Sequence, residues 1–342
     1  MRYKQFFVQL ILLAFVILIA FFISHRKKKG EYISLSGFAQ GTTYHITYES
    51  KNGENYQCAV DSLLADIDMS LSIYQPSSVI SRFNRNEPGT IADQKFIFVF
   101  NKSFEVFQKT SGAFDITVGP IVNALGFGSS DTLNVDSTLI EGLLTSVGMN
   151  KISLQHTRLI KQTPDMVLDV NAIAQGYSVD LVAEFLEARK IRNYMVEIGG
   201  EVRAKGKNSK NLVWRIGIDR PVEGNFLPGA DLQAIIRLKN RSLATSGNYR
   251  RFYEKNGVKF VHTVNPKTGY PVISNLLSAT VVANDCITAD AYATALMVFG
   301  VEKSIEFLEK NRFLDAFLIY ADEEGKFRTF GTERLQKFIE EQ

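Results

Sequence analysis

The chain has 342 residues, of which 45% are hydrophobic and 22% are charged, a composition that excludes an intrinsically disordered protein. Its net charge is only +3, with much of the positive charge near the N-terminus, so it does not read as a nucleic-acid-binding protein. Cys58 and Cys286 lie in apolar helical stretches and lack CxxC or Cys/His metal spacing, so we expect both to be small buried side chains.

The N-terminus contains an apolar segment long enough to cross a membrane. Residues 6–23, "FFVQLILLAFVILIAFFI", have Gln9 as their one polar member and approach the length of about 20 residues that a spanning helix needs. Basic residues flank the segment on both sides, and no small-residue cleavage signal follows it. We therefore expect residues 1–30 to be an uncleaved membrane anchor with a basic flank and residues 31–342 to form one further domain.

Downstream of the anchor, strand-like and helical patterns come in separate runs. Residues 33–49 are rich in Thr, Tyr and Ile and read as one or two strands broken at Gly41. Strand-like runs return over 191–284, with a hairpin turn at Asn256–Gly257. Because strands do not alternate regularly with helices, we expect an α+β fold. Helices are expected at 56–74, 95–110, 136–148, 175–190, 286–299 and 301–312, followed by a strand at 315–322 and a short C-terminal helix.

The stretch 111–120, "SGAFDITVGP", is polar and glycine-rich within apolar surroundings. Its Asp115 directly follows Phe114. This order fits a turn closed by an Asx-type hydrogen bond, and it also fits an aromatic ring and a carboxylate presented together to a ligand.

A second such stretch is 168–180, "LDVNAIAQGYSVD". Asn171 lies at the end of an apolar run, and Gly176 opens a predicted helix whose first-turn amides would be able to face an anion. The alternative is an ordinary strand-to-helix turn with Asp180 as a surface residue.

Two further stretches contain candidate catalytic and metal-binding groups. His262 precedes a Pro–Gly loop in "VHTVNPKTGYP", where a structural histidine is the commoner case. In "CITADAYATALM", residues 286–297, Asp290 and Thr294 lie one helical turn apart on the same face. Asp290 would suit a helix start, and Thr294 would suit a hydrogen bond back to a carbonyl one turn earlier. Together with a backbone carbonyl, however, they form an oxygen-only set suited to Mg²⁺.

Taken in order, these stretches resemble the ApbE-type FAD:protein FMN transferases over about residues 37–300. The resemblance implies an ApbE-like α+β fold with antiparallel-rich mixed sheets flanked by helices, and FAD in a cleft between two subdomains. It also implies transfer of the FMN half of FAD onto a Thr or Ser hydroxyl of an acceptor protein, with Mg²⁺ bound and AMP leaving. The matching segments are "GTTYHITY", "LSIYQPSSVISRFN", "SGAFDITVGPIV", "LDVNAIAQGYSVD", "VEIGGEVRAKG", "ATSGNYRRF", "HTVNPKTGYP" and "TADAYATAL".

Position by position, the resemblance also implies residue roles. The metal ligands would be Asp290, Thr294 and the backbone carbonyl of Ala174, and His262 and Asp290 would be the catalytic pair, with His262 as general base. Two positions depart from the family pattern, since Gln175 stands where Lys is usual and Gln40 where Met is frequent. The residues expected around the flavin and adenosine are Gln40, Tyr74, Ala113, Phe114, Asp115, Asn171, Tyr177 and Val264.

Partners and location follow from the same resemblance. Acceptors in the family include subunits of membrane redox complexes and extracytoplasmic flavoproteins. More Lys and Arg follow the apolar segment than precede it, which favours a cytoplasmic domain, but large domains are translocated despite basic flanks. We expect a single-pass protein of the inner membrane with its catalytic domain on the periplasmic side. An FAD pyrophosphatase and a non-enzymatic, membrane-tethered FAD-binding protein remain alternatives.

Overall fold

The computed structural model describes residues 30–126, 136–222, 229–248, 252–255, 258–261 and 263–341. The expected membrane segment, the predicted turn at Asn256–Gly257 and His262 lie outside these ranges. Within them, no helix has both the length and the apolar character needed to cross a membrane.

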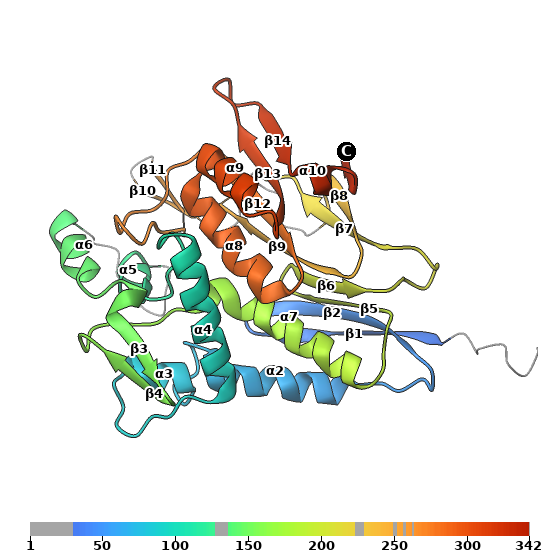
Figure 1. The fold of residues 1–342 in the computed structure, drawn as a ribbon, viewed down its shortest axis with the longest axis horizontal. Coiled ribbons are helices and arrows are strands. Elements are labelled where there is room, and N and C mark those ends of the chain that lie inside the picture. The colour runs from blue at the N-terminus through green and yellow to red at the C-terminus, as the bar shows by residue number, and fades with distance from the viewer. Residues whose placement is uncertain are drawn as a thin grey trace, which may run out of the picture.

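An eight-stranded sheet forms the centre of the described residues, and neighbouring strands pair antiparallel throughout it (Figure 1). The expected α+β class is therefore confirmed. In spatial order the strands are β1 (Glu31–Ala39), β2 (Thr42–Ser50), β5 (Tyr194–Ile198), β6 (Glu201–Lys205), β9 (Arg241–Gly247), β12 (Leu276–Ala283), β13 (Asp315–Ala321) and β14 (Phe327–Gly331).

Helices cover one face of this sheet, with α7 and α8 packed directly on it and against each other (Figure 1). α7 lies on β5 and β6, while α8 lies on β9 and β12. The described helices are α2 (Gln57–Leu71), α3 (Val79–Asn84), α4 (Gln94–Lys109), α5 (Gly119–Ala124), α6 (Ser137–Leu144), the 3₁₀ turn η1 (Met149–Lys151), α7 (Asn171–Ala188), α8 (Cys286–Phe299), α9 (Val301–Lys310) and α10 (Glu333–Gln336).

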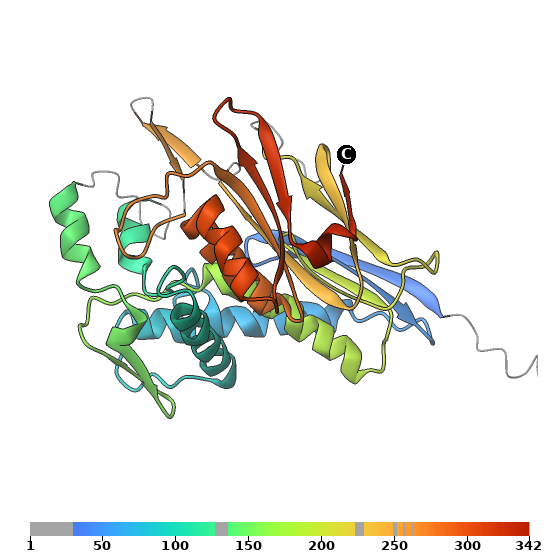
Figure 2. The ribbon, with the colours of Figure 1, turned by 45° about the horizontal axis from the view of Figure 1, so that its top comes forward.

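A smaller sheet covers the opposite face (Figure 2). Its strand order is β15 (Ile339–Glu341), β8 (Leu232–Leu238), β7 (Trp214–Asp219). Consecutive residues of β12 and β13 therefore enter different cores: Val281 packs toward the helices, and Val282 packs toward the small sheet. Both faces are buried, so these strands read as continuous apolar runs rather than alternating ones. The remaining hairpins are β3 (Ile152–Gln155) with β4 (Arg158–Lys161), and β10 (Phe252–Lys255) with β11 (Val258–Val261).

The predicted break at Gly41 is a two-residue hairpin turn between β1 and β2. Ala39 pairs with Thr42, and the intervening Gln40 and Gly41 have φ values of 54° and 73°. Two consecutive positive φ values are typical of the hairpin turn whose twist matches that of the strands. The turn fixes the position of the Gln40 side chain at the end of the sheet.

Several boundaries differ from the sequence predictions. α7 begins at Asn171 rather than at residue 175, since the N–H groups of Ile173 and Ala174 already bond to the carbonyl of Val170. α6 ends at Leu144 rather than at residue 148. The backbone N–H groups of residues 145–147 bond to the carbonyls three residues earlier, which is the pattern of a 3₁₀ turn and not of an α-helix. Strand β15 follows α10 and was not predicted.

The prediction that both cysteines are buried is half wrong. Cys286 is buried, but Cys58 is exposed. The buried side of α2 includes Val60 and Leu64. Cys58 precedes Val60 by two residues and therefore points away from that side.

Candidate functional site

The two side chains predicted to bind metal both lie on α8. Asp290 is in the second turn of the helix, and Thr294 follows one turn later. Asp285 is the N-cap of α8 and accepts a hydrogen bond from the N–H of Thr288 over 3.0 Å. The reading of Asp290 as a helix-start residue is therefore wrong. Its side chain is buried, and its Oδ2 accepts a hydrogen bond from the backbone N–H of Gly176 on α7 over 3.0 Å.

Thr294 and the Ala174 carbonyl lie on the elements that surround Asp290. The Thr294 hydroxyl contacts the hydroxyl of Ser246 on β9 at 3.2 Å, rather than bonding to the preceding turn of its own helix. The Ala174 carbonyl, two residues before Gly176 on α7, accepts a hydrogen bond from Ser178 Oγ over 2.9 Å. The three predicted ligands therefore lie on α7 and α8, which pack against each other, and Thr294 also contacts β9.

Gly176 explains how the two helices come so close. A Cβ at this position would lie 2.5 Å from the Cys286 carbonyl oxygen and 2.8 Å from Asp290 Cβ. Only a residue without a side chain fits this contact. The prediction that Gly176 opens an anion-binding helix end is wrong, because Gly176 lies in the second turn of α7 and its N–H faces a carboxylate.

The surroundings of Asp290 disfavour a negative charge. Burial raises the pKa of its carboxyl well above the ordinary aspartate range, and the nearby carboxylate of Asp180 raises this pKa further. In the described part of the chain, the Gly176 N–H is the one hydrogen-bond donor to this carboxylate. A cation would satisfy the remaining oxygen, so the donor set fits a hard metal ion.

The donor set is sparse for a metal site. Within the described ranges, no group of three or more His, Cys, Asp or Glu side chains is arranged to hold a metal ion. One carboxylate, one hydroxyl and one carbonyl leave half of an octahedral shell to water and ligand oxygens, which is how Mg²⁺ commonly binds beside phosphates.

Gln40 approaches the same region from the β1–β2 turn. Its Nε2 donates to Ser178 Oγ over 2.8 Å, and Ser178 in turn donates to the Ala174 carbonyl. Gln40 Oε1 is buried without a hydrogen-bond partner among the described residues. An unsatisfied buried acceptor requires a donor, so this oxygen is available to a ligand group that carries an N–H or O–H.

The side chain of Gln175 lies at the turn between β5 and β6. Its Nε2 would lie 2.6 Å from a Cβ at Gly199, where φ is 65°. The glycine is needed for its backbone conformation.

The predicted aromatic contacts differ in their exposure. Tyr177 is buried and stacks on Phe98 with ring centroids 5.3 Å apart. Burial raises the pKa of Tyr177 to about 12, so the phenol is neutral at pH 7. Tyr74 is 61% exposed and is therefore open to a ligand. Phe98 is also exposed and was not singled out from the sequence.

Asp115 forms the Asx-type turn that was one of its two readings. Its Oδ1 accepts hydrogen bonds from the Thr117 N–H and hydroxyl, and its Oδ2 accepts one from the Met149 N–H. Ala113 and Phe114 are buried, so the Phe114 ring belongs to the core. Asp115 also lines a cavity of about 350 Å³ together with Lys267. The Asp115 carboxylate therefore stabilises the local turn through these hydrogen bonds, and the residue also borders the cavity.

The remaining predicted residues are Asn171, Val264 and His262. Asn171 is exposed at the first position of α7, beside Asp169, which lines a second cavity of about 290 Å³. Val264 is buried in a small apolar cluster with Ile121. His262 lies outside the described residues.

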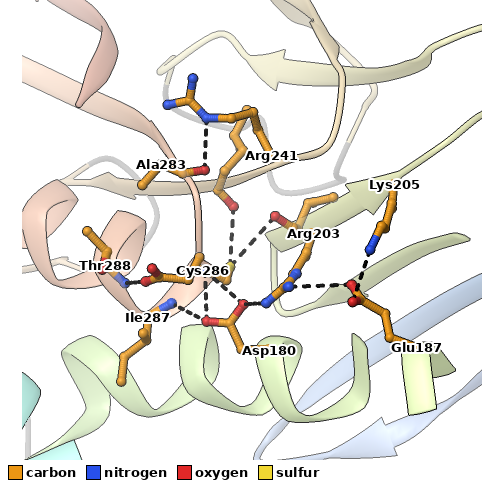
Figure 3. Close-up of polar contacts among 12 residues, drawn as sticks. Asp180, Glu187, Arg203, Lys205, Arg241, Ala283, Cys286, Ile287 and Thr288 are labelled. Carbon is orange, nitrogen blue, oxygen red and sulfur yellow. Dashed lines mark hydrogen bonds and ion pairs between the residues drawn. The ribbon is translucent and has the colours of Figure 1, made fainter. Parts of the chain in front are cut away.

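Sequence reasoning missed a charged group that joins the two site helices. Asp180 was read as a surface residue, but it is 4% exposed and accepts hydrogen bonds from the first amides of α8 (Figure 3). Its spacing of four residues from Gly176 places both on one face of α7. That spacing was the one signal available in the sequence.

Comparisons with known proteins agree with this fold. A family model described as the ApbE family matches residues 40–318. The FAD:protein FMN transferase of Haemophilus influenzae is 38% identical over 92% of this chain and 93% of that protein, and its Vibrio cholerae counterpart is 35% identical over 92% and 94%. The solved flavin transferase ApbE from Vibrio cholerae aligns with a TM-score of 0.80 and 33% identity, covering 90% of this chain and 99% of that one. The apo form of the Pseudomonas stutzeri flavinyl transferase ApbE gives a TM-score of 0.80, 30% identity and coverages of 91% and 98%. With a matching family model over most of its length and relatives of this similarity, the chain belongs to the ApbE family.

Proposed function

We propose that this chain transfers FMN from FAD to a Thr or Ser hydroxyl of an acceptor flavoprotein, with Mg²⁺ bound beside the FAD pyrophosphate. The transferase activity is supported by several relatives named FAD:protein FMN transferase that match this chain over most of its length. The observation that carries the metal part is the buried Asp290 carboxylate, placed beside Thr294 and α7 and without a cationic partner among the described residues.

Asp290, Thr294 and the Ala174 carbonyl would hold the metal ion. Mg²⁺ bound there would neutralise pyrophosphate charge and stabilise the departing AMP. The chain's own residues would position FAD around this point: Gln40 offers an unsatisfied buried oxygen, and the exposed ring of Phe98, stacked on the buried Tyr177, offers an aromatic surface.

The transfer breaks the phosphoanhydride bond of FAD and forms a phosphoester bond to the acceptor. The acceptor hydroxyl oxygen attacks the phosphorus of the FMN half, and the bond from that phosphorus to the bridging oxygen breaks. AMP leaves with the bridging oxygen. His262 would accept the proton of the attacking hydroxyl as general base. Positioning and charge neutralisation supply most of the rate enhancement in reactions of this class.

An FAD pyrophosphatase would use the same site with water in place of the acceptor hydroxyl. Incubation of the full chain with FAD, Mg²⁺ and a candidate acceptor flavoprotein separates the two, with intact-mass spectrometry of the acceptor and quantification of AMP. Transfer predicts one FMN on the acceptor for each AMP released. Free FMN with an unmodified acceptor would favour hydrolysis, and tight FAD binding without AMP release would favour a non-enzymatic carrier.

The site of action is part of the proposal. Residues 6–23 would anchor the chain in the inner membrane and hold the catalytic domain on the periplasmic side, where it would meet membrane redox-complex subunits or extracytoplasmic flavoproteins. Protease treatment of intact spheroplasts tests this orientation. Digestion of the domain in intact spheroplasts supports it, and protection until lysis would place the domain in the cytoplasm.

A further inference from the structure

Outside the proposed ligand set, a buried carboxylate ties the two site helices together. Asp180 on α7 accepts hydrogen bonds from the N–H of Cys286 over 2.8 Å and of Ile287 over 2.9 Å, the first two residues of α8 (Figure 3). The next free amide, that of Thr288, is satisfied by Asp285. An acidic side chain from another helix thus completes the N-terminal cap of α8.

This cap and the Gly176 contact form two attachment points between the same helices. Gly176 and Asp180 lie one turn apart on α7, and they meet α8 at Asp290 and at Cys286. One contact would let α8 pivot, whereas two contacts fix both its rotation and its position along α7. Asp290 and Thr294 are carried by the helix that is held in this way.

Asp180 is itself held in place from the sheet. The guanidinium of Arg203 on β6 donates to Asp180 Oδ1 over 2.7 Å. Arg203 also pairs with Glu187 at 3.5 Å, and Glu187 pairs with Lys205 at 3.0 Å (Figure 3). Cys286 Sγ meanwhile faces the carbonyls of β6 and β9. The start of α8 is therefore fixed against both α7 and the main sheet.

We propose that Asp180 is a positioning residue for the metal site: by fixing the first turn of α8 on α7, it sets the separation between the Ala174 carbonyl and the side chains of Asp290 and Thr294. This inference rests on the proposed function, because it assumes that these three groups bind a metal ion. Groups that orient metal ligands without touching the ion commonly change metal affinity by about 10–100-fold when altered.

The chemistry of the position requires a carboxylate. Two backbone N–H groups and one guanidinium converge on the two Asp180 oxygens. An asparagine would keep one acceptor oxygen and turn an N–H₂ group toward one of these donors, leaving a donor unsatisfied. Whichever way its amide turns, Asp180→Asn therefore loses a bond to α8 or the bond to Arg203 that holds the group in place, with almost no change in side-chain size.

The test measures metal binding rather than turnover. Mn²⁺ affinity is titrated by electron paramagnetic resonance with saturating FAD, and FAD affinity is measured separately in EDTA by flavin fluorescence. We expect Asp180→Asn to weaken Mn²⁺ binding at least about tenfold while metal-free FAD binding stays within about threefold of wild type. The matched control is Glu187→Gln, which alters the same network without touching α8 and should leave Mn²⁺ affinity within about twofold.

Three results would overturn the positioning role. Equal Mn²⁺ affinity of wild type and a folded Asp180→Asn protein would overturn it while leaving the metal site intact. A wild-type chain that binds no Mn²⁺ with FAD present would overturn the metal site and the positioning role together. If Asp180→Asn does not fold, Arg203→Lys decides: it removes the guanidinium fork and should weaken Mn²⁺ binding at least about threefold, whereas unchanged affinity would overturn the proposal.

Discussion

The backbone N–H of Gly176 donates to Asp290 Oδ2 over 3.0 Å, and a side chain at Gly176 would have to occupy the place of Asp290 Cβ and the Cys286 carbonyl. This contact joins a glycine on one helix to the predicted metal ligand on the next. The same contact therefore packs α7 against α8 and positions the Asp290 carboxylate.

Gly176→Ala should destabilise the protein and impair metal binding together. The added methyl group would force α8 away from α7, and overpacking of this kind costs about 1–3 kcal/mol of the free energy of unfolding. Urea denaturation and Mn²⁺ titration measure the two effects. The control is Gly142→Ala in α6, where nothing lies within 4 Å of a new Cβ and a gain of about 0.5–1 kcal/mol is expected. Wild-type Mn²⁺ affinity in Gly176→Ala would contradict the coupling.

Asp290→Ala should abolish metal-dependent release of AMP from FAD while the fold survives, because it removes the one carboxylate among the three proposed ligands. AMP is measured by chromatography after incubation with FAD and Mg²⁺, with far-ultraviolet circular dichroism as the check on folding. The matched variant is Asp285→Asn, five residues earlier in the chain, since Asn caps a helix as well as Asp and should keep activity. Full AMP release by Asp290→Ala would remove the metal assignment.

The raised pKa of Asp290 predicts that metal affinity falls as the solution becomes acidic. Protons compete with the ion for the carboxylate, and the competition begins at a higher pH than for an ordinary aspartate near 4. Without metal the sign for folding is the reverse: the folded state keeps a proton that the unfolded state releases, so stability falls as pH rises from about 4 through the raised pKa. Mn²⁺ titrations and EDTA-treated melts between pH 5 and 8 measure both slopes, and a pH-independent Mn²⁺ affinity would argue against Asp290 as ligand.

His262→Ala should slow transfer by about 10²–10⁴-fold with FAD and Mn²⁺ affinities retained, because a general base acts on the proton and not on binding. Single-turnover measurement of AMP release in the presence of an acceptor separates the chemical step from binding. An unchanged rate would return His262 to a structural role.

The sequence predicted what local patterns determine and missed what tertiary contacts determine. The Gly41 hairpin and α8 follow from turn chemistry and helical spacing, and both were located correctly. The start of α7 was placed too late, because the turn at Asn171 is stabilised by backbone bonds that no residue type signals. Asp180 was misjudged for a related reason: its role depends on the N-terminus of a helix more than 100 residues later in the chain.

In the candidate site, too, the residues with a local sequence pattern were predicted and those defined by tertiary contacts were not. Asp290 and Thr294 were found because their spacing of four residues is visible in the chain itself. Ala174 entered only through the family resemblance, since a backbone carbonyl has no sequence signature. Arg203 was not singled out at all, because an arginine in a strand reads as an ordinary exposed position until its partner is known.

Crystals of the full chain grown with FAD and Mn²⁺, and measured for anomalous scattering of the metal, test the central claim most directly. The account predicts one anomalous peak in coordination contact with Asp290, Thr294 and the Ala174 carbonyl, and with oxygens of the FAD pyrophosphate. Bound FAD with its pyrophosphate elsewhere, or a peak that none of these three groups touches, would contradict it.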